Sequence, residues 1–320
     1  MSELALTTAG EPLPADRNPA AVYLAGLSSD KSRRAILGAL RLVCAALGAG
    51  DDPLQVPWQE LRYQHVAAIR AHLLESGLAP ATINLAISSL RGVAKEAYGL
   101  GLMSGEDYQR LRLVKGVRGE RLPAGRCLSS GEIAALMQAC ANDHSAAGAR
   151  DAAIIGCLYV GGLRRSEIPE LDLSDYDSET GELAVHGKGN KERRVYLNNG
   201  AGAALADWLA VQGAEPGPLF LPVNKGGCIQ WRRLSDQAVY GLLQKRAAEA
   251  GVRDFSPHDL RRTFVGDLLD AGADISTVQK LAGHASIITT QRYDRRPEEA
   301  KRKAASLLHL PYRSRRLVRG

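Results

Sequence analysis

The chain carries a histidine and arginine pair and, further on, a histidine and tyrosine pair whose side chains could together act on a phosphate ester. His258 and Arg261 lie three residues apart in SPHDLRRTF, and Tyr293 follows His284 by nine residues in HASIITTQRYD. A phenol is a weak nucleophile near neutral pH and needs a base or an electropositive setting to react. Tyr293 taken alone fits an ordinary surface tyrosine better, so its significance depends on the neighbours that the fold gives it.

The segment around His258 has the features of a well-specified helix start. Ser256 is suited to the N-cap, Pro257 to the first helical position, and Asp259 stands at capping-box spacing. His258 and Arg261 would then share a solvent-facing side of the first turn, where free N–H groups and the helix dipole favour an anion. A phosphate site and a plain capped surface helix explain this segment equally well.

Two motifs earlier in the chain could supply more positive charge. In GGLRRSE, a short helical turn would place Glu167 on the same face as Arg164, although a surface arginine paired with that glutamate is the simpler interpretation. In HGKGNKE, Lys188 would lie at the tip of a turn between Gly187 and Gly189, which let the backbone approach a partner closely. A solvated lysine is the alternative at that position.

Taken together, these residues suit the transfer of a phosphodiester. A phosphorus under attack becomes five-coordinate and gains negative charge, so fixed positive donors stabilise it. The candidate donors are Arg164, Arg261, His284 and Lys188. His258 could accept the proton of the Tyr293 hydroxyl, and Lys188 could protonate the departing 5′ oxygen. No Asp/Glu cluster of metal-binding spacing accompanies them, so we expect a reaction that uses neither metal nor any other cofactor.

The ordered set GLR, SE, GKGNK, HxLR, GH and Y closely resembles the tyrosine recombinase family of phage integrases and Xer-like site-specific recombinases. The resemblance covers residues 128–310 in its catalytic motifs. It implies that the catalytic residues are Arg164, Lys188, His258, Arg261, His284 and Tyr293, with Glu167 as a supporting acid. It also implies that Tyr293 attacks a DNA phosphate to form a 3′-phosphotyrosyl bond, and that a freed 5′-hydroxyl later attacks the partner strand's phosphotyrosine.

Two residues depart from the pattern of that family. Pro169 in SEIPEL would shorten a helix after Arg164. Tyr196 in RRVYL stands where the family often has proline. Neither residue is a reacting group, so both bear on local geometry and not on the chemistry.

The motifs must be positioned by a chain that is mainly α-helical with a small antiparallel β-sheet. Hydrophobic periodicity predicts helices over 32–47, 58–74, 82–98, 129–137 and 150–160. Two strand-like runs, 182–186 and 193–197, flank a turn rich in Gly and Asn and predict a hairpin. A further short helix should start at Ser286 and end at Pro297.

Breaks in composition divide the chain into parts. We expect a flexible arm over 1–16, a helical DNA-binding domain over 17–114, a linker over 115–126, a catalytic α+β domain over 127–310 and a basic tail over 311–320. The helical part resembles the core-binding domain of the same family. Two such domains joined by a linker predict a clamp around duplex DNA.

The DNA-binding surface is expected on the helix over 82–98 and beside the hairpin tip. Its candidate residues are Thr82, Asn84, Ser88, Arg91, Lys95 and Lys191. By analogy with the family, the partners are double-stranded DNA with an inverted-repeat core site and further copies of the chain, a dimer per site and a tetramer in the synapse. A C-terminal amphipathic helix near Ala304, Leu307 and Leu308 could dock on a neighbouring subunit or pack on its own domain.

The charge of the chain is concentrated at its C-terminal end. The net charge is +6, and residues 253–320 hold 14 Lys/Arg against 8 Asp/Glu, which leaves 27 against 27 for the rest. Such a basic region favours an anionic partner, nucleic acid before an anionic membrane. The five cysteines form no CxxC pair, so neither a zinc site nor a disulfide framework is indicated.

The sequence contains neither a signal peptide pattern nor an apolar run of the ~20 residues that cross a bilayer. We therefore expect a cytoplasmic, nucleoid-associated protein. Two other functions stay open at this point: a DNA-binding protein that has lost catalysis, and a type IB topoisomerase that relaxes supercoils. Should Tyr293 not react, Tyr312 is the alternative nucleophile.

Overall fold

The computed structural model describes residues 13–119, 125–187, 191–294 and 305–306. Over these ranges the chain is mostly helical and has one two-stranded antiparallel sheet. The predicted fold class, mainly α with a small antiparallel sheet, is confirmed. The chain divides into two compact units, Met1–Ala124 and Gly125–Gly320. Nowhere in the described ranges does a helix have the length and apolar character that a membrane span requires.

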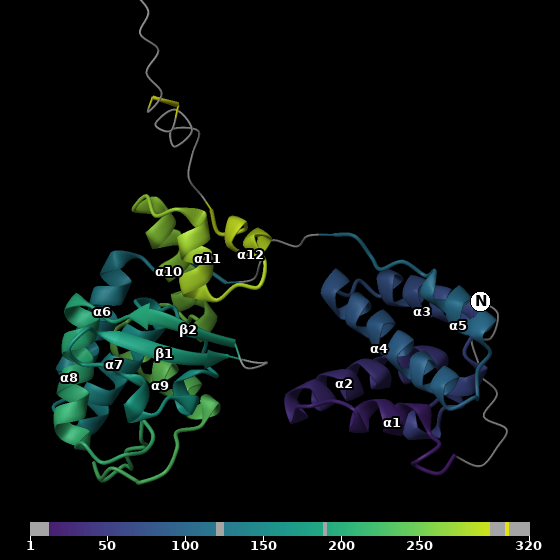
Figure 1. Cartoon of the computed structure of the whole chain (residues 1–320), viewed down its shortest axis with the longest axis horizontal. Helices are drawn as coiled ribbons and strands as arrows, with labels where there is room; N and C mark the ends of the chain where they lie inside the picture. Colours follow the sequence, from purple (N-terminus) through teal and green to yellow (C-terminus); the bar gives the residue numbers. More distant parts are fainter. Residues whose placement is uncertain (1–12, 120–124, 188–190, 295–304, 307–320) are drawn as a thin grey trace, which may run out of the picture. The chain divides into compact units, whose positions relative to one another are not determined.

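The first unit is a helical bundle arranged around one long helix. Its elements are α1 (Pro19–Ala25), α2 (Asp30–Leu47), η1 (Pro53–Gln55), η2 (Trp58–Glu60), α3 (Tyr63–Glu75), α4 (Pro80–Gly99) and α5 (Gly105–Arg112). Helix α4 packs against α1, α2, α3 and α5 (Figure 1). Trp58, Ile69 and Leu90 are fully buried in the core between them. The remaining face of α4 is exposed.

The register of α4 follows from its sequence. Pro80 occupies the first turn, and the predicted apolar stripe through Ile83, Ile87 and Leu90 is buried. Gly92 has a specific packing role, because a Cβ at this position would come within 2.3 Å of the Tyr23 ring. A glycine there lets α1 approach α4 closely.

The helices of the first unit differ from the prediction in two places. The expected helix over 58–74 is divided into η2 and α3, because Trp58 turns into the core and its Nε1 donates to the Pro53 carbonyl at 2.7 Å. Helices α1 and α5 were not predicted. Both are short and begin at polar N-caps, Asn18 and Ser104, a local signal that periodicity over a longer window overlooks.

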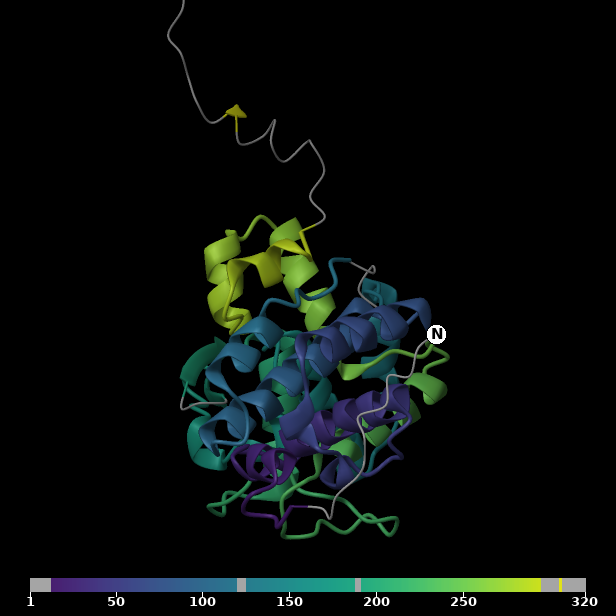
Figure 2. The same ribbon diagram turned by 90° about the vertical axis from the view of Figure 1, so that its right-hand side faces the viewer.

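The described part of the second unit has eleven elements, of which helix α7 is the buried centre. They are α6 (Ser130–Ala141), α7 (Ala146–Tyr159), η3 (Ile168–Glu170), η4 (Leu173–Asp175), β1 (Glu182–Gly187), β2 (Lys191–Tyr196), α8 (Asn199–Gln212), α9 (Asp236–Glu249), α10 (Pro257–Asp270), α11 (Ile275–Ala282) and α12 (Ile287–Gln291). Helix α7 contacts α6, α8, α9 and α10. Helices α10, α11 and α12 lie together in both views (Figure 1; Figure 2), and α11 also contacts β2.

The hairpin and the helix starts agree with the sequence. Strands β1 and β2 pair antiparallel, with Leu183 opposite Val195 and Val185 opposite Arg193. The capping boxes predicted at Ser129 and at Ser256 are both present. These features depend on residues a few positions apart, which a sequence displays directly.

The end predicted for the helix that starts at Ser286 is wrong, whereas the segment after Arg164 is short, as Pro169 implied. After Arg164 the chain makes the 3₁₀ turn η3, with Pro169 in its first turn, and no α-helix follows there. Helix α12 ends at Gln291 rather than at Pro297, and Pro297 lies outside the described residues. The early end places Tyr293 in the turn directly after the helix.

Candidate active site

The first turn of α10 exposes His258 to solvent and buries Arg261. His258 is exposed, as expected, but only 2% of the Arg261 surface is accessible, so the prediction that both face solvent is wrong for Arg261. Helix α10 is covered by α7 on one side and α11 on another, which buries the position three residues after His258. The Arg261 guanidinium donates to the carbonyls of Gly162 and Ala282. A guanidinium has five N–H groups, so these two bonds do not exhaust it.

The C-terminal end of α11 holds three arginines from three different elements. Arg193 of β2 donates its Nε to the Leu281 carbonyl at 3.0 Å, Arg261 of α10 donates to the Ala282 carbonyl, and Arg164 donates to the Gly283 carbonyl at 2.7 Å. The last carbonyls of a helix have no partner inside the helix and carry its negative dipole end. Three consecutive carbonyls therefore fix the spacing of three cations.

Glu167 joins two of these arginines. Its Oε1 accepts from Arg164 Nη1 at 2.8 Å and from Arg193 Nη1 at 2.9 Å, and its Oε2 accepts from the Arg164 N–H and from Arg193 Nη2, both at 2.7 Å. Burial raises the pKa of this carboxyl, but the hydrogen bonds and charges of Arg193 and Arg164 outweigh burial and bring the pKa to about 2. Glu167 is therefore ionised at neutral pH. The predicted contact between Arg164 and Glu167 is present.

Tyr293 lies against His258 across 35 residues of sequence. The His258 Nε2 is 3.1 Å from the Tyr293 hydroxyl, and the two rings meet edge to face with centroids 6.5 Å apart. The guanidinium carbon of Arg262 lies 5.5 Å from the centre of the Tyr293 ring. The phenol thus has both a nitrogen base in hydrogen-bond range and a cation at its face.

His284 is oriented by Thr290. Its Nδ1 lies 2.9 Å from the Oγ1 of Thr290, which is fully buried, and its ring stacks with that of Tyr293 at 6.1 Å. Burial, together with the charges of Arg261 and Arg164, lowers the pKa of His284 to about 4. The imidazole is therefore neutral at pH 7. If the threonine hydroxyl donates to Nδ1, the proton of the ring is on Nε2, which is then a hydrogen-bond donor.

The pKa values of the other two groups follow from the same crowding of cations. Desolvation and the charges of Arg261 and Arg262 lower the pKa of His258, which favours the neutral base. Burial and the neighbouring Arg164 and Arg193 lower the pKa of Arg261 to about 9. That value still leaves Arg261 charged at neutral pH.

The structure thus brings six of the predicted site residues into one cluster, Arg164, Glu167, His258, Arg261, His284 and Tyr293. Lys188 and the side chain of Lys191 lie outside the described residues. Thr82, Asn84, Ser88, Arg91 and Lys95 belong to the first unit. Across the described residues, no three His, Cys, Asp or Glu side chains form a group that could hold a metal ion.

The sequence reasoning overlooked Arg193, Arg262, Gly283 and Thr290. A signal for Arg193 was present, because strand alternation puts it on the same face as buried Val195. A charge that points inward needs a partner. Arg262 contacts Tyr293 only through the tertiary fold, whereas Thr290 lies six residues after His284 in the same segment.

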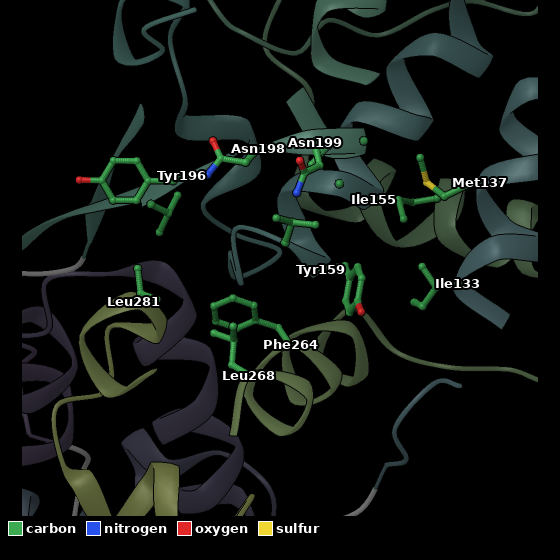
Figure 3. A pocket seen from close by; sticks show the side chains of 15 residues that line it. Ile133, Met137, Ile155, Tyr159, Tyr196, Asn198, Asn199, Phe264, Leu268 and Leu281 are labelled. Atoms are coloured by element: carbon green, nitrogen blue, oxygen red, sulfur yellow. The ribbon is translucent and has the colours of Figure 1, made fainter. Parts of the chain in front are cut away.

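A cavity of about 470 Å³ lies beside the cluster in the second unit. Most of its lining is apolar, and Figure 3 shows Tyr159 of α7 and Phe264 and Leu268 of α10 around it. Phe264 also packs on Gly162, where a Cβ would come within 2.4 Å of its ring. Since the Gly162 carbonyl holds Arg261, one wall of this cavity supports the candidate site.

Helical units and a tyrosine hydroxyl beside a histidine base and several arginines define the class of enzymes that transfer DNA strands through a tyrosine. Comparisons with known proteins agree. Residues 126–299 match the phage integrase family. The chain is 33% identical to tyrosine recombinase XerC of Proteus mirabilis, over 74% of this chain and 75% of the relative. It is 34% identical to tyrosine recombinase XerC of Mycobacterium sp. (strain JLS), over 83% and 88%.

The chain belongs to the phage integrase family and is a tyrosine-type site-specific recombinase. A solved structure with a similar fold is a lambda integrase tetramer bound to a Holliday junction. Its TM-score is 0.61, with 16% identity over 90% of this chain and 79% of that chain. At that identity, the likeness concerns the fold alone.

Proposed function

We propose that Tyr293 is the nucleophile with which this recombinase cuts and rejoins DNA. The observation that carries the proposal is the 3.1 Å separation between the Tyr293 hydroxyl and His258 Nε2 inside a cluster of arginines. His258 accepts the phenolic proton while the Tyr293 oxygen bonds to phosphorus, and the bond from phosphorus to the 5′ oxygen breaks. A 3′-phosphotyrosine and a 5′-hydroxyl result. Because one phosphodiester replaces another, the bond energy is kept for rejoining.

Three donors are placed to stabilise the five-coordinate phosphorus. Arg164 is the most accessible, with 42% of its side chain exposed, while Arg261 lies deeper on the adjacent carbonyl of α11. Neutral His284 donates through Nε2. Fixed donors of this kind need no reorganisation as charge develops, which is why they favour the transition state over the substrate.

Lys188 is proposed as the acid that protonates the departing 5′ oxygen. The residue lies outside the described residues, so the support comes from its place in the motif GKGNK between the two strands of the observed hairpin. A lysine there follows β1, and β2 carries Arg193, which reaches the cluster. The hairpin would thus bring both the acid and a buried cation to the same site.

The test of the nucleophile is Tyr293→Phe, which removes one oxygen. The purified chain is incubated with duplex fragments from around its own gene, and covalent protein–DNA complexes are trapped and sequenced. Tyr293→Phe should give none and still bind DNA. Tyr196→Phe removes the hydroxyl of a tyrosine that is 47% exposed on β2 and should behave like the unchanged chain.

Covalent complexes formed by Tyr293→Phe would overturn the assignment and direct attention to Tyr312. If neither the unchanged chain nor Tyr293→Phe forms a covalent complex and Tyr293→Phe keeps the protein's function in the cell, a role in binding alone is favoured. Relaxation of supercoiled plasmid that lacks paired sites would instead indicate an activity like that of type IB topoisomerases.

We also propose a separate function for each segment of the chain. Residues 17–114 would bind DNA, 115–126 would link, and 127–310 would carry out the chemistry, flanked by the arm 1–16 and the tail 311–320. The helical bundle around α4 and the catalytic cluster in the second unit support this division. Two such domains on one linker would grip duplex DNA as a clamp and act at the nucleoid.

The contacts of α4 narrow the proposed DNA-binding residues. Asn84 exchanges two hydrogen bonds with the backbone of Val117, and Arg91 donates to the carbonyls of Arg112 and Val114. Both side chains thus hold the end of the first unit in place. Among the residues predicted to bind DNA on this helix, Thr82, Ser88 and Lys95 have exposed side chains, and we propose these as the contacts to DNA.

We further propose that two copies bind an inverted-repeat core site and four assemble in the synapse, as the tetrameric form of lambda integrase suggests. The segment near Ala304, Leu307 and Leu308 would join neighbouring copies, and these three residues lie outside the described residues. The apolar cavity in Figure 3 is a candidate acceptor for it. Deleting everything after Arg296 should abolish assembly and recombination; if both survive, exchange between subunits is wrong.

A further inference from the structure

Arg193 occupies a position from which it cannot serve as a surface cation. Only 11% of its side chain is exposed, against 42% for Arg164. All three of its guanidinium nitrogens are engaged: Nη1 and Nη2 on Glu167, and Nε on the Leu281 carbonyl. The side chain therefore connects β2 with the loop that carries Arg164 and with the end of α11.

The charges around Glu167 explain what this connection does. Arg164 and Glu167 alone form an ion pair with no net charge. Such a pair gives a nearby phosphate little electrostatic stabilisation. A second cation on the same carboxylate leaves a surplus of one positive charge. Each oxygen of Glu167 accepts one bond from each arginine, so the carboxylate is shared and not held by Arg164 alone.

Gly283 makes the position of Arg193 possible. Its φ is +62°, a left-handed conformation that ends α11, and a Cβ there would come within 2.9 Å of Arg193 Cδ. The aliphatic part of Arg193 thus lies directly over the residue whose carbonyl binds Arg164. The two arginines are held against the same turn.

We propose that Arg193 is a positioning residue, which balances the negative charge of Glu167 so that Arg164 is not tied up by this carboxylate and stays in place for the DNA phosphate. The inference rests on the proposed function, in which Arg164 contacts that phosphate. Arg193 itself touches no reacting atom. Its effect should appear in the chemical step and should pass through Glu167.

The first test compares Arg193→Gln with Arg194→Gln in the full chain. Arg194 is the next residue of β2, is 65% exposed and pairs with Glu182 across the hairpin, so its loss removes the same charge from the outside of the strand. At saturating DNA, using duplex fragments from around the gene, Arg193→Gln should cleave about 100-fold more slowly, the usual cost of misplacing a reacting group by about 1 Å. Arg194→Gln should stay within about twofold.

The DNA affinity of Arg193→Gln should stay close to that of the unchanged chain, because the lost interaction acts on the transition state. The cleavage rate of Arg193→Lys should fall between those of Arg193→Gln and the unchanged chain, since lysine restores the charge but not the bidentate contact with the carboxylate. Equal cleavage rates for Arg193→Gln and Arg194→Gln would overturn the proposal.

The decisive comparison adds Arg193→Gln to Glu167→Gln. With the carboxylate gone, no anion competes for Arg164, so the double variant should cleave at nearly the rate of Glu167→Gln alone. A merely structural Arg193 would cost the same factor in both backgrounds, and that result would refute a role through Glu167. Thermal melting reports whether Arg193→Gln alone folds. If it does not, the double variant can still be compared with Glu167→Gln, because the double variant buries no unpaired carboxylate.

Tyr293→Phe in the same assay separates the two proposals. If it abolishes covalent complexes while the Arg193 variants behave like Arg194→Gln, only the role of Arg193 is wrong. If Tyr293→Phe still forms covalent complexes, the proposed function itself is wrong.

Discussion

The Nε2 of His258 lies within 3.1 Å of the Tyr293 hydroxyl, although the two residues belong to different elements. His258 is fixed by the capped start of α10, whereas Tyr293 follows α12 and packs against the apolar cluster that α10 and α11 share. The base and the nucleophile are thus brought together by helix packing. Their separation is as sensitive to that packing as to the two side chains themselves.

The pH dependence of cleavage should report a histidine with a lowered pKa. A base acts in its neutral form, and a pKa below the ordinary 6.5 leaves more than half of His258 neutral at pH 6.5. The second-order rate constant at subsaturating DNA, which reports the free enzyme, should therefore fall on an acidic limb centred below pH 6.5. His258→Gln should lower the plateau by about 100-fold or more and remove that acidic limb. An acidic limb centred above pH 6.5, or one that survives in His258→Gln, would exclude His258 as the base.

Thr290→Val should slow cleavage without unfolding the protein. Valine keeps the volume of a fully buried side chain but leaves the Nδ1 of His284 without its partner at 2.9 Å, so Nε2 is no longer held as the donor. We expect a loss of about tenfold in the rate at saturating DNA, equivalent to one hydrogen bond of about 1.4 kcal/mol. Thr289→Val, at the neighbouring threonine of α12, is the matched control. Equal rates for the two variants would show that the threonine hydroxyl does not orient His284.

Gly283→Ala should slow the cleavage step in addition to lowering the stability of the fold. Gly283 and Gly251 have nearly the same left-handed φ, +62° and +64°, but a Cβ at Gly251 meets nothing within 4 Å, whereas one at Gly283 meets Arg193. Both substitutions should lower the free energy of unfolding by about 1–2 kcal/mol through backbone strain. Only Gly283→Ala should also slow the cleavage step, as measured in a single turnover. Similar cleavage rates for both variants would mean that the contact with Arg193 has no part in catalysis.

Substitutions at Lys95 and Arg91, on the same helix, should affect DNA binding and folding stability separately. Lys95→Gln should reduce the slope of log affinity against log salt by about 0.9, the value for one lost phosphate contact, with no change in melting temperature. Arg91→Gln should instead lower the free energy of unfolding by about 1–3 kcal/mol, because the carbonyls of Val114 and Arg112 lose their donor. An unchanged salt slope in Lys95→Gln would remove Lys95 from the DNA surface.

Local features of this protein could be predicted from its sequence for a physical reason. Three kinds of feature depend on neighbours no more than four positions apart in the sequence. They are the capping boxes at Ser129 and Ser256, the buried stripe of α4, and the pairing of Arg164 with Glu167. Helix and strand periodicity display such relations directly. The order of the motifs was likewise enough to indicate the family.

The composition of the site was decided by tertiary structure. The burial of Arg261 depends on α7 and α11 covering α10, and the inward position of Arg193 depends on Glu167, 26 residues away. The meeting of three arginines on three consecutive carbonyls requires a loop, a strand and a helix to pack against the same turn. Contacts between distant residues leave no periodic trace along the chain, because they are set by how whole elements pack. The sequence by itself therefore determined which chemistry was present, and only the packing of the elements decided which side chains share the phosphate site and which hold them in place.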